Sequence, residues 1–173
     1  MRLFVAAWPP VEVRDALAAL PRPEVPEVRW TLPDRWHVTV AFLGEVTQVE
    51  LAGWAGVVDD TAAALDRSPE ATLGPATELL GPAVLTVPVA GLEIAAAAFR
   101  ATALGAGRAL DERPYRGHLT LARARRRARL SRSLAGQAVQ ATWTVSELCL
   151  VESVPGARGE QPRYVTLSSA VIS

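Results

Sequence analysis

His37-Val38-Thr39-Val40-Ala41 and His118-Leu119-Thr120-Leu121-Ala122 repeat one pattern: histidine, apolar residue, threonine, apolar residue, alanine. The two copies contain the only histidines of the 173-residue chain. Side chains alternate between the two faces of a β-strand, so each copy is expected to present its histidine and threonine on one face and its apolar pair on the other. Two such strands side by side would form a polar site with an apolar backing.

The segments around the two copies predict a mixture of strands and helices. Short apolar runs bounded by glycine or proline predict strands, whereas the apolar positions of 11–20, 47–65 and 91–107 recur at helical spacing. No polar linker separates these elements, so we expect a single α+β domain over residues 1–173 with mostly antiparallel sheets. Each half carries one His-x-Thr motif. The domain is therefore expected to have two lobes related by approximate symmetry, with both histidines in the central cleft.

The composition argues against several classes of protein. The chain has no run of 18 or more uncharged apolar residues, so no membrane-spanning helix is expected. Pro9 interrupts the first apolar run too early for a secretory signal, and a cytoplasmic protein is expected. Cys149 is the only cysteine and lies in an apolar run, which predicts a buried side chain. With no cluster of metal-binding residues, we expect no metal and no cofactor, and nothing indicates an obligate dimer, so a monomer is expected.

The net charge is zero, but the charge is unevenly distributed. Residues 1–112 contain eight arginines and 15 acidic residues, whereas residues 113–173 contain ten arginines and three acidic residues. The chain has no lysine, and guanidinium groups bind phosphate through two parallel hydrogen bonds. One run of arginines is interpreted either as an exposed loop or as a guide for an RNA backbone. It comprises Arg125, Arg126, Arg127, Arg129 and Arg132.

Two histidines on one surface can perform what a single histidine cannot. An imidazole has an unperturbed pKa of about 6.5, so one copy can be neutral while the other is protonated. Such a pair can act as base and acid in a single step. Hydrolysis of a cyclic phosphodiester requires this division, because one group activates water and another protonates the departing ribose oxygen on the opposite side of phosphorus. The threonine hydroxyls can donate hydrogen bonds to the remaining phosphate oxygens.

The two motifs also resemble the signature of a known family. Read as His37-Val38-Thr39-Val40-Ala41-Phe42-Leu43-Gly44 and His118-Leu119-Thr120-Leu121-Ala122-Arg123, they are similar to those of the 2H phosphoesterases. The most similar branch is the bacterial and archaeal RNA 2′,3′-cyclic phosphodiesterases, long called 2′-5′ RNA ligases. The resemblance covers nearly the whole chain. Its other parts are Arg2-Leu3-Phe4-Val5-Ala6 with Pro9-Pro10, Arg29-Trp30 with Pro33, Arg113-Pro114-Tyr115 and Arg163-Tyr164.

The resemblance implies a role for each motif residue. His37 is expected to be the general acid that protonates the leaving 3′ oxygen, and His118 the general base that activates water, while Thr39 and Thr120 hold the phosphate. Because the two motifs are nearly symmetric, the residues alone leave open which histidine is the acid. The implied reaction is metal-independent hydrolysis of a terminal 2′,3′-cyclic phosphate on RNA to a 2′-phosphate, with reverse ligation as a minor activity. Gly117 departs from the family, which often has proline there, and this change is expected to affect rigidity and not chemistry.

Strand parity leads to expectations for the residues near the motifs. Arg123 lies five positions after His118, so an ideal pleat would place it on the opposite face. It is expected to contact phosphate, as the family pattern implies, if a bulge or the strand end reorients it, and to be structural otherwise. By the same parity, Phe42 is expected in the core. Trp30 and Trp36 are expected to pack inside the protein, with stacking on a base as the alternative.

Two other functions fit the same residues. A non-catalytic RNA- or nucleotide-binding module would retain the cleft and the arginines, although simple binding does not require both histidines. Alternatively, a 2H enzyme with the same pair could open a small cyclic nucleotide or an ADP-ribose cyclic phosphate. Turnover on cyclic-phosphate RNA distinguishes the enzyme from the binding module, and a comparison of RNA ends with mononucleotides distinguishes the two kinds of substrate.

Overall fold

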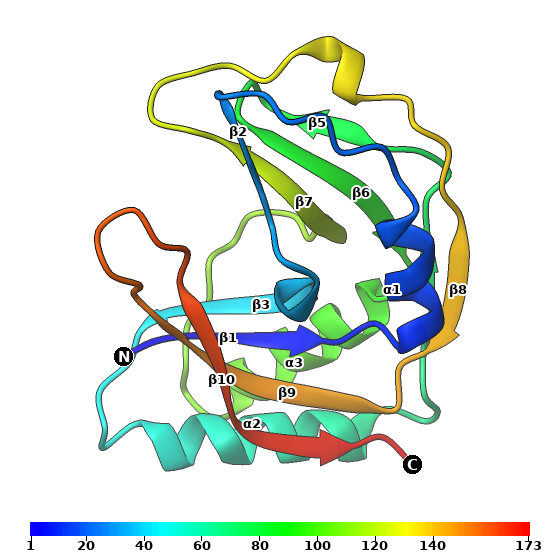
Figure 1. The fold of residues 1–173 in the computed structure, drawn as a ribbon. Coiled ribbons are helices and arrows are strands. Elements are labelled where there is room, and N and C mark those ends of the chain that lie inside the picture. Colours follow the sequence, from blue (N-terminus) through cyan, green and yellow to red (C-terminus); the bar gives the residue numbers. More distant parts are fainter.

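The computed structural model describes residues 1–173, which form a curved ten-stranded sheet and three α-helices (Figure 1). All paired strands are antiparallel, in the order β10-β9-β1-β3-β7-β6-β4-β8, with β2 added to β7 and β5 added to β6. The strands are β1 (Arg2–Ala7), β2 (Val28–Trp30), β3 (Val38–Glu45), β4 (Glu70–Leu73), β5 (Glu78–Leu80), β6 (Val84–Ala90), β7 (His118–Ala124), β8 (Ala141–Thr144), β9 (Glu147–Val154) and β10 (Arg163–Val171). The helices are α1 (Val11–Ala18), α2 (Leu51–Ala64) and α3 (Glu93–Gly105), with short 3₁₀ turns η1 (Pro33–Arg35) and η2 (Arg132–Leu134). The predicted α+β class with mostly antiparallel strands is confirmed.

The two motif strands are neighbours at the centre of the sheet. Val38 of β3 pairs with Leu119 of β7, and both side chains are completely buried. Strands β1, β9 and β10 continue the sheet beyond β3, and β6, β4 and β8 continue it beyond β7. Figure 1 shows β1, β9 and β10 in its lower part and β6 in its upper part, with β3 and β7 between them, while β8 runs down the right side. The sheet order therefore has the approximate two-fold repetition that the paired motifs predict.

Helices α2 and α3 cover the lower half of the sheet (Figure 1). Trp54 of α2 stacks on Phe99 of α3 with ring centroids 6.2 Å apart, and the Arg108 guanidinium lies 4.6 Å from the Trp54 ring. The apolar stripes of these helices are buried against the sheet, which is the usual source of helix stability in a globular domain. None of the helices has the length and apolar character needed to span a membrane.

Both motif strands contain a bulge directly after the motif threonine. The register with the neighbouring strand skips Val40 in β3 and Leu121 in β7. A bulge shifts the alternation of side chains by one residue, so Phe42 and Arg123, each five positions after a histidine, turn to the histidine's face. The expectation that Phe42 lies in the core is therefore wrong, since 62% of its surface is exposed. For Arg123, the structure shows the expected reorientation by a bulge, which places its side chain in the cleft.

Two elements differ in extent from the sequence prediction. The backbone N–H of Thr47 donates to the Glu50 carboxylate at 2.9 Å, which is the reach-back contact of a capping box, but the helix itself begins only at Leu51. The apolar segment 142–151 is divided between β8 and β9. Strand β8 pairs with β4, whereas β9 pairs with β1. The chain must change direction between them, and the periodicity of the sequence does not reveal this change.

Gly117, immediately before the second motif, lies where a side chain has no room. A Cβ atom there would collide with the Val89 carbonyl oxygen of β6, whose N–H already donates to the Gly117 carbonyl at 3.0 Å. We expect Gly117→Ala to destabilise the protein by about 1–3 kcal/mol through overpacking, measured by urea unfolding. Gly56→Ala, in open space within α2, is the matched control and should stabilise by up to about 1 kcal/mol. Equal stability of the wild-type and Gly117→Ala proteins would contradict this packing.

Candidate active site

The four polar residues of the two motifs line one cleft with a volume of about 560 Å³. His37 immediately precedes β3 and Thr39 lies near the start of that strand, whereas His118 and Thr120 lie at the start of β7. Because Val38 pairs with Leu119 in an antiparallel register, extending that register by one residue places each histidine opposite the threonine of the other motif. The structure thus brings together the residues that the sequence repeat singled out.

Both imidazoles are fixed by the same hydrogen bond. The Nδ1 atom of His37 lies 2.8 Å from the Arg35 carbonyl oxygen, and the Nδ1 atom of His118 lies 2.8 Å from the Arg116 carbonyl oxygen. A carbonyl oxygen only accepts, so each Nδ1 carries the proton and donates. The Nε2 atom of each ring therefore remains available for a ligand, as a proton acceptor when the ring is neutral and as a donor when it is charged.

His37 lies in an aromatic environment. Its ring centroid is 4.9 Å from that of Phe4, 5.4 Å from that of Trp8 and 5.0 Å from that of Tyr164, which meets it edge-on. Burial among these rings disfavours the charged imidazolium and, despite the opposing hydrogen bond to Arg35, lowers the pKa of His37 to about 4. His37 is therefore neutral at pH 7.

Five arginines line the cleft, and only one of them lies within a motif. Arg123 shares the face of His118, and its positive charge contributes to lowering the pKa of His37. Sequence reasoning missed the other four as cleft residues, although three of them lie in segments with family resemblance. They are Arg2 of β1, Arg29 of β2, Arg35 of η1 and Arg113 in the loop before β7.

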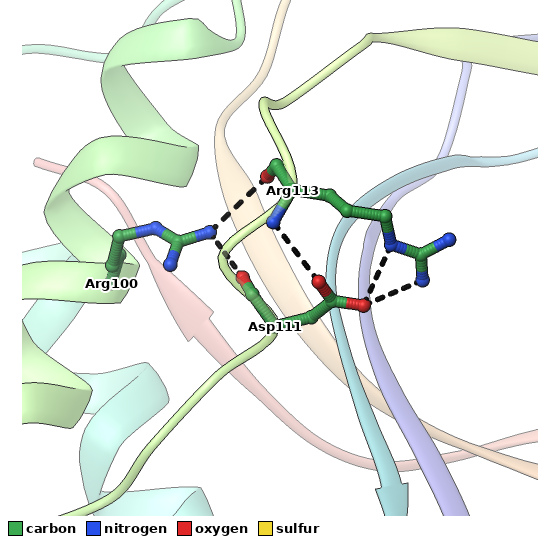
Figure 2. A network of polar contacts seen from close by, with 3 residues as sticks. All are labelled: Arg100, Asp111 and Arg113. Atoms are coloured by element: carbon green, nitrogen blue, oxygen red, sulfur yellow. Dashed lines mark hydrogen bonds and ion pairs between the residues drawn. The ribbon is translucent and has the colours of Figure 1, made fainter.

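Arg113 differs from the other cleft arginines because its charge is compensated. Asp111 accepts from the Arg113 backbone N–H at 3.0 Å and from its side-chain Nε at 2.7 Å (Figure 2). Arg100 of α3 donates to the Asp111 carbonyl oxygen at 2.6 Å and to the Arg113 carbonyl oxygen at 3.5 Å. This network fixes the loop that leads into the second motif.

A second cavity of about 570 Å³ adjoins the cleft. The two share Thr39, Phe42, Arg113 and His118 in their linings, so they are continuous at the motif residues. Tyr115 adds a further aromatic wall to the second cavity. The combined space is large enough for a nucleotide attached to a phosphate held at the histidines.

The tryptophans and the arginine run lie outside the centre of this site. Trp36 is completely buried, which excludes stacking on a base, and the Trp30 indole N–H donates to the Pro23 carbonyl. Arg125, like the other arginines of the run, is exposed and follows the end of β7. Cys149 is buried, as predicted. No group of three or more histidine, cysteine, aspartate or glutamate side chains is placed together to hold a metal ion.

Comparison with solved structures shows close likeness over the whole chain. TT0787 of Thermus thermophilus is 26% identical with a TM-score of 0.81, the alignment covering 99% of this chain and 98% of that one. A protein described as a phosphoesterase is 28% identical with a TM-score of 0.72, covering 99% and 98%. E. coli LigT in complex with NADP+ is 27% identical with a TM-score of 0.72, covering 99% and 97%. No protein-family model and no curated protein matches the sequence.

The fold, the paired histidines and these neighbours define an enzyme of the phosphoesterase type. Its two histidines lie at the beginnings of two neighbouring strands at the centre of the sheet, His37 just before β3 and His118 as the first residue of β7, and each is followed at the same spacing by a threonine. The chain has the fold of the 2H phosphoesterase superfamily, which agrees with the resemblance of its two motifs.

The low pKa of His37 makes folding stability depend on pH. Between its ordinary value of 6.5 and about 4, the unfolded chain binds a proton at His37 that the folded protein does not bind. The stability contributed by neutral His37 is therefore present above pH 6.5 and lost as the pH falls towards 4, by at most about 3 kcal/mol. We expect His37→Asn to remove this part of the dependence in urea unfolding at pH 4.5 and pH 7.5. The carboxylates are common to both proteins, so an identical pH dependence would contradict the assignment.

Proposed function

We propose that this protein hydrolyses the terminal 2′,3′-cyclic phosphate of RNA to a 2′-phosphate by general acid and base catalysis. The observation that carries the proposal is the matched pair of imidazoles in one cleft, each with Nδ1 bound to a carbonyl and Nε2 available to the ligand. Both proton transfers of the reaction can be made by these two groups, so the step needs no metal ion.

The step can be written in full for the roles that the family resemblance implies. His118 removes a proton from water as the water oxygen attacks phosphorus. The bond between phosphorus and the 3′ oxygen breaks in line, and His37 donates its proton to that oxygen. The products are a 3′ hydroxyl and a 2′-phosphate. Thr39 and Thr120 donate hydrogen bonds to the non-bridging oxygens, and Arg123 compensates the charge that develops on them.

The low pKa of His37 bears directly on this assignment. A neutral imidazole is ready to act as a base, so the low pKa of His37 by itself favours the reverse roles. For His37 to act as the acid, the bound phosphate anion must raise its pKa. Such a rise has a physical source, because a phosphate beside His37 favours the charged imidazolium and also compensates the positive charge of Arg123, one of the causes that lower the pKa of His37.

The structural neighbours support a phosphorylated nucleotide as ligand. E. coli LigT has been crystallised with 3′-AMP, with ATP and with phosphate, as well as with NADP+. The continuous cavities and the uncompensated arginines of this chain fit the same chemical class. Ligation through a 2′-5′ bond is expected as a minor activity, because a 5′ hydroxyl can attack phosphorus in place of water. His118 then removes the proton of that hydroxyl, and His37 protonates the departing 3′ oxygen.

The function is tested with a short RNA that ends in a 2′,3′-cyclic phosphate. In EDTA we expect the wild-type protein to give a 2′-phosphate, with the 2′ and 3′ isomers resolved by chromatography. His37→Ala and His118→Ala should each lower kcat by about 10²- to 10⁴-fold, the usual contribution of one acid or base. Wild-type rates in both variants would refute the mechanism. Tight RNA binding with no turnover would indicate the non-catalytic module, and turnover restricted to mononucleotides would indicate the small-substrate enzyme.

The roles of the two histidines are separated by changing the leaving group. If sulfur replaces the 3′ oxygen of the cyclic phosphate, the departing thiolate needs no protonation. We expect this substrate to restore most of the rate of the variant that lacks the acid, His37→Ala, and little of the rate of His118→Ala. The opposite result would assign the acid to His118, in agreement with the low pKa of His37.

A further inference from the structure

Two arginines face each other at the far end of the second motif strand. Arg29 of β2 pairs with Arg123 of β7, and both line the cleft. Directly opposed side chains on neighbouring antiparallel strands lie within about 5.5 Å at their Cβ atoms, and like charges in that position are destabilising. A folded protein tolerates the arrangement most easily when an anion binds between or beside the two guanidinium groups.

Arg35, on the turn between β2 and β3, is a second arginine whose hydrogen-bonding capacity is not used within the protein. Its Nη1 atom is buried and has no hydrogen-bond partner, although the side chain lines the cleft. Leaving a buried charged donor without a partner costs more than leaving a neutral one. The only side-chain ion pairs of the protein join Arg113 to Asp111 and Arg116 to Glu78, so neither Arg29 nor Arg35 has a carboxylate within 4.0 Å.

We propose that Arg29 and Arg35 form a second phosphate subsite, which binds the phosphodiester on the 5′ side of the terminal nucleotide. The inference rests on the proposed function and deepens it, because it makes the preferred substrate an RNA end and not a free cyclic nucleotide. A cyclic mononucleotide without a 5′-phosphate has only the reactive phosphate. An RNA end has a second one, and the two arginines supply the charge and the free N–H groups to hold it.

The direction of β7 is consistent with this path. The strand leads from Thr120 to Arg123, which lies only about 7 Å further along, because the bulge at Leu121 makes these three steps of β7 span two residues of β6 at about 3.3 Å each. Arg29 lies across from that end, and the exposed Arg125 follows it. An RNA backbone that left the histidines in this direction would meet positive charge at each step.

The test compares three substrates that differ in the 5′ phosphate. These are adenosine 2′,3′-cyclic phosphate, the same nucleotide with a 5′-phosphate, and the dinucleotide ApA with a terminal 2′,3′-cyclic phosphate. For Arg29→Gln and Arg35→Gln we expect kcat/KM to fall about 10- to 100-fold on the last two substrates and less than about twofold on the first. Arg29→Lys keeps the positive charge but loses the paired N–H donors of the guanidinium group. Its kcat/KM should therefore lie between those of the wild type and Arg29→Gln.

The controls separate a lost contact from a general effect. Arg14→Gln, on the exposed face of α1, removes the same charge away from the cleft and should leave all three rates unchanged. Arg29→Gln should also reduce the dependence of log kcat/KM on log salt concentration for the dinucleotide by about one phosphate contact, a slope change of about 0.7. Equal losses on all three substrates, or no loss on any, for Arg29→Gln would overturn the subsite.

Failure of the proposed function gives a different result. If the wild-type protein turns over none of the substrates, the enzyme assignment fails, and binding still tests the subsite. The probe is then ApA with a terminal 2′-phosphate, compared with adenosine 2′-phosphate by calorimetry. A loss of affinity of about tenfold or more in Arg29→Gln, confined to the dinucleotide, supports the subsite, and unchanged affinity for both overturns it.

Discussion

The pairing of Val38 with Leu119 is the contact on which the site depends. Both side chains are buried on the core face of the sheet, and their register fixes the two motif strands relative to each other. A slip of one residue would move a polar face into the core and an apolar face into the cleft, which burial forbids. The apolar residues between each histidine and threonine therefore hold the polar residues in place, although they make no contact with a ligand themselves.

The bulge after each motif threonine is the second constraint. The bulge occurs at the same place in both strands, but it gives the two histidines different surroundings. The residue that it turns into the cleft is Phe42 in β3 and Arg123 in β7. Together with the aromatic rings around His37, this makes one side of the cleft flat and apolar and the other cationic. An approximately symmetric fold thus gives two chemically similar histidines different environments.

Charge along the chain does not map simply onto charge in space. The first 112 residues are net acidic, yet Arg2, Arg29 and Arg35 from that part line the cleft beside Arg123. The acidic residues of this part are mostly exposed, whereas these three arginines have no carboxylate partner. The positive charge of the cleft consequently comes from arginines that the order of the strands brings together. The exposed arginines that follow β7 extend this positive surface.

The sequence by itself determined the α+β class, most strands and helices, and the four residues of the two motifs, because alternation and helical spacing are local properties. Tertiary structure decided what depends on neighbours. Strand parity misplaced Phe42 and left Arg123 undecided, since a bulge is defined by the partner strand. The pairing of Arg29 with Arg123 and the burial that lowers the pKa of His37 likewise arise only when segments distant in sequence are packed together.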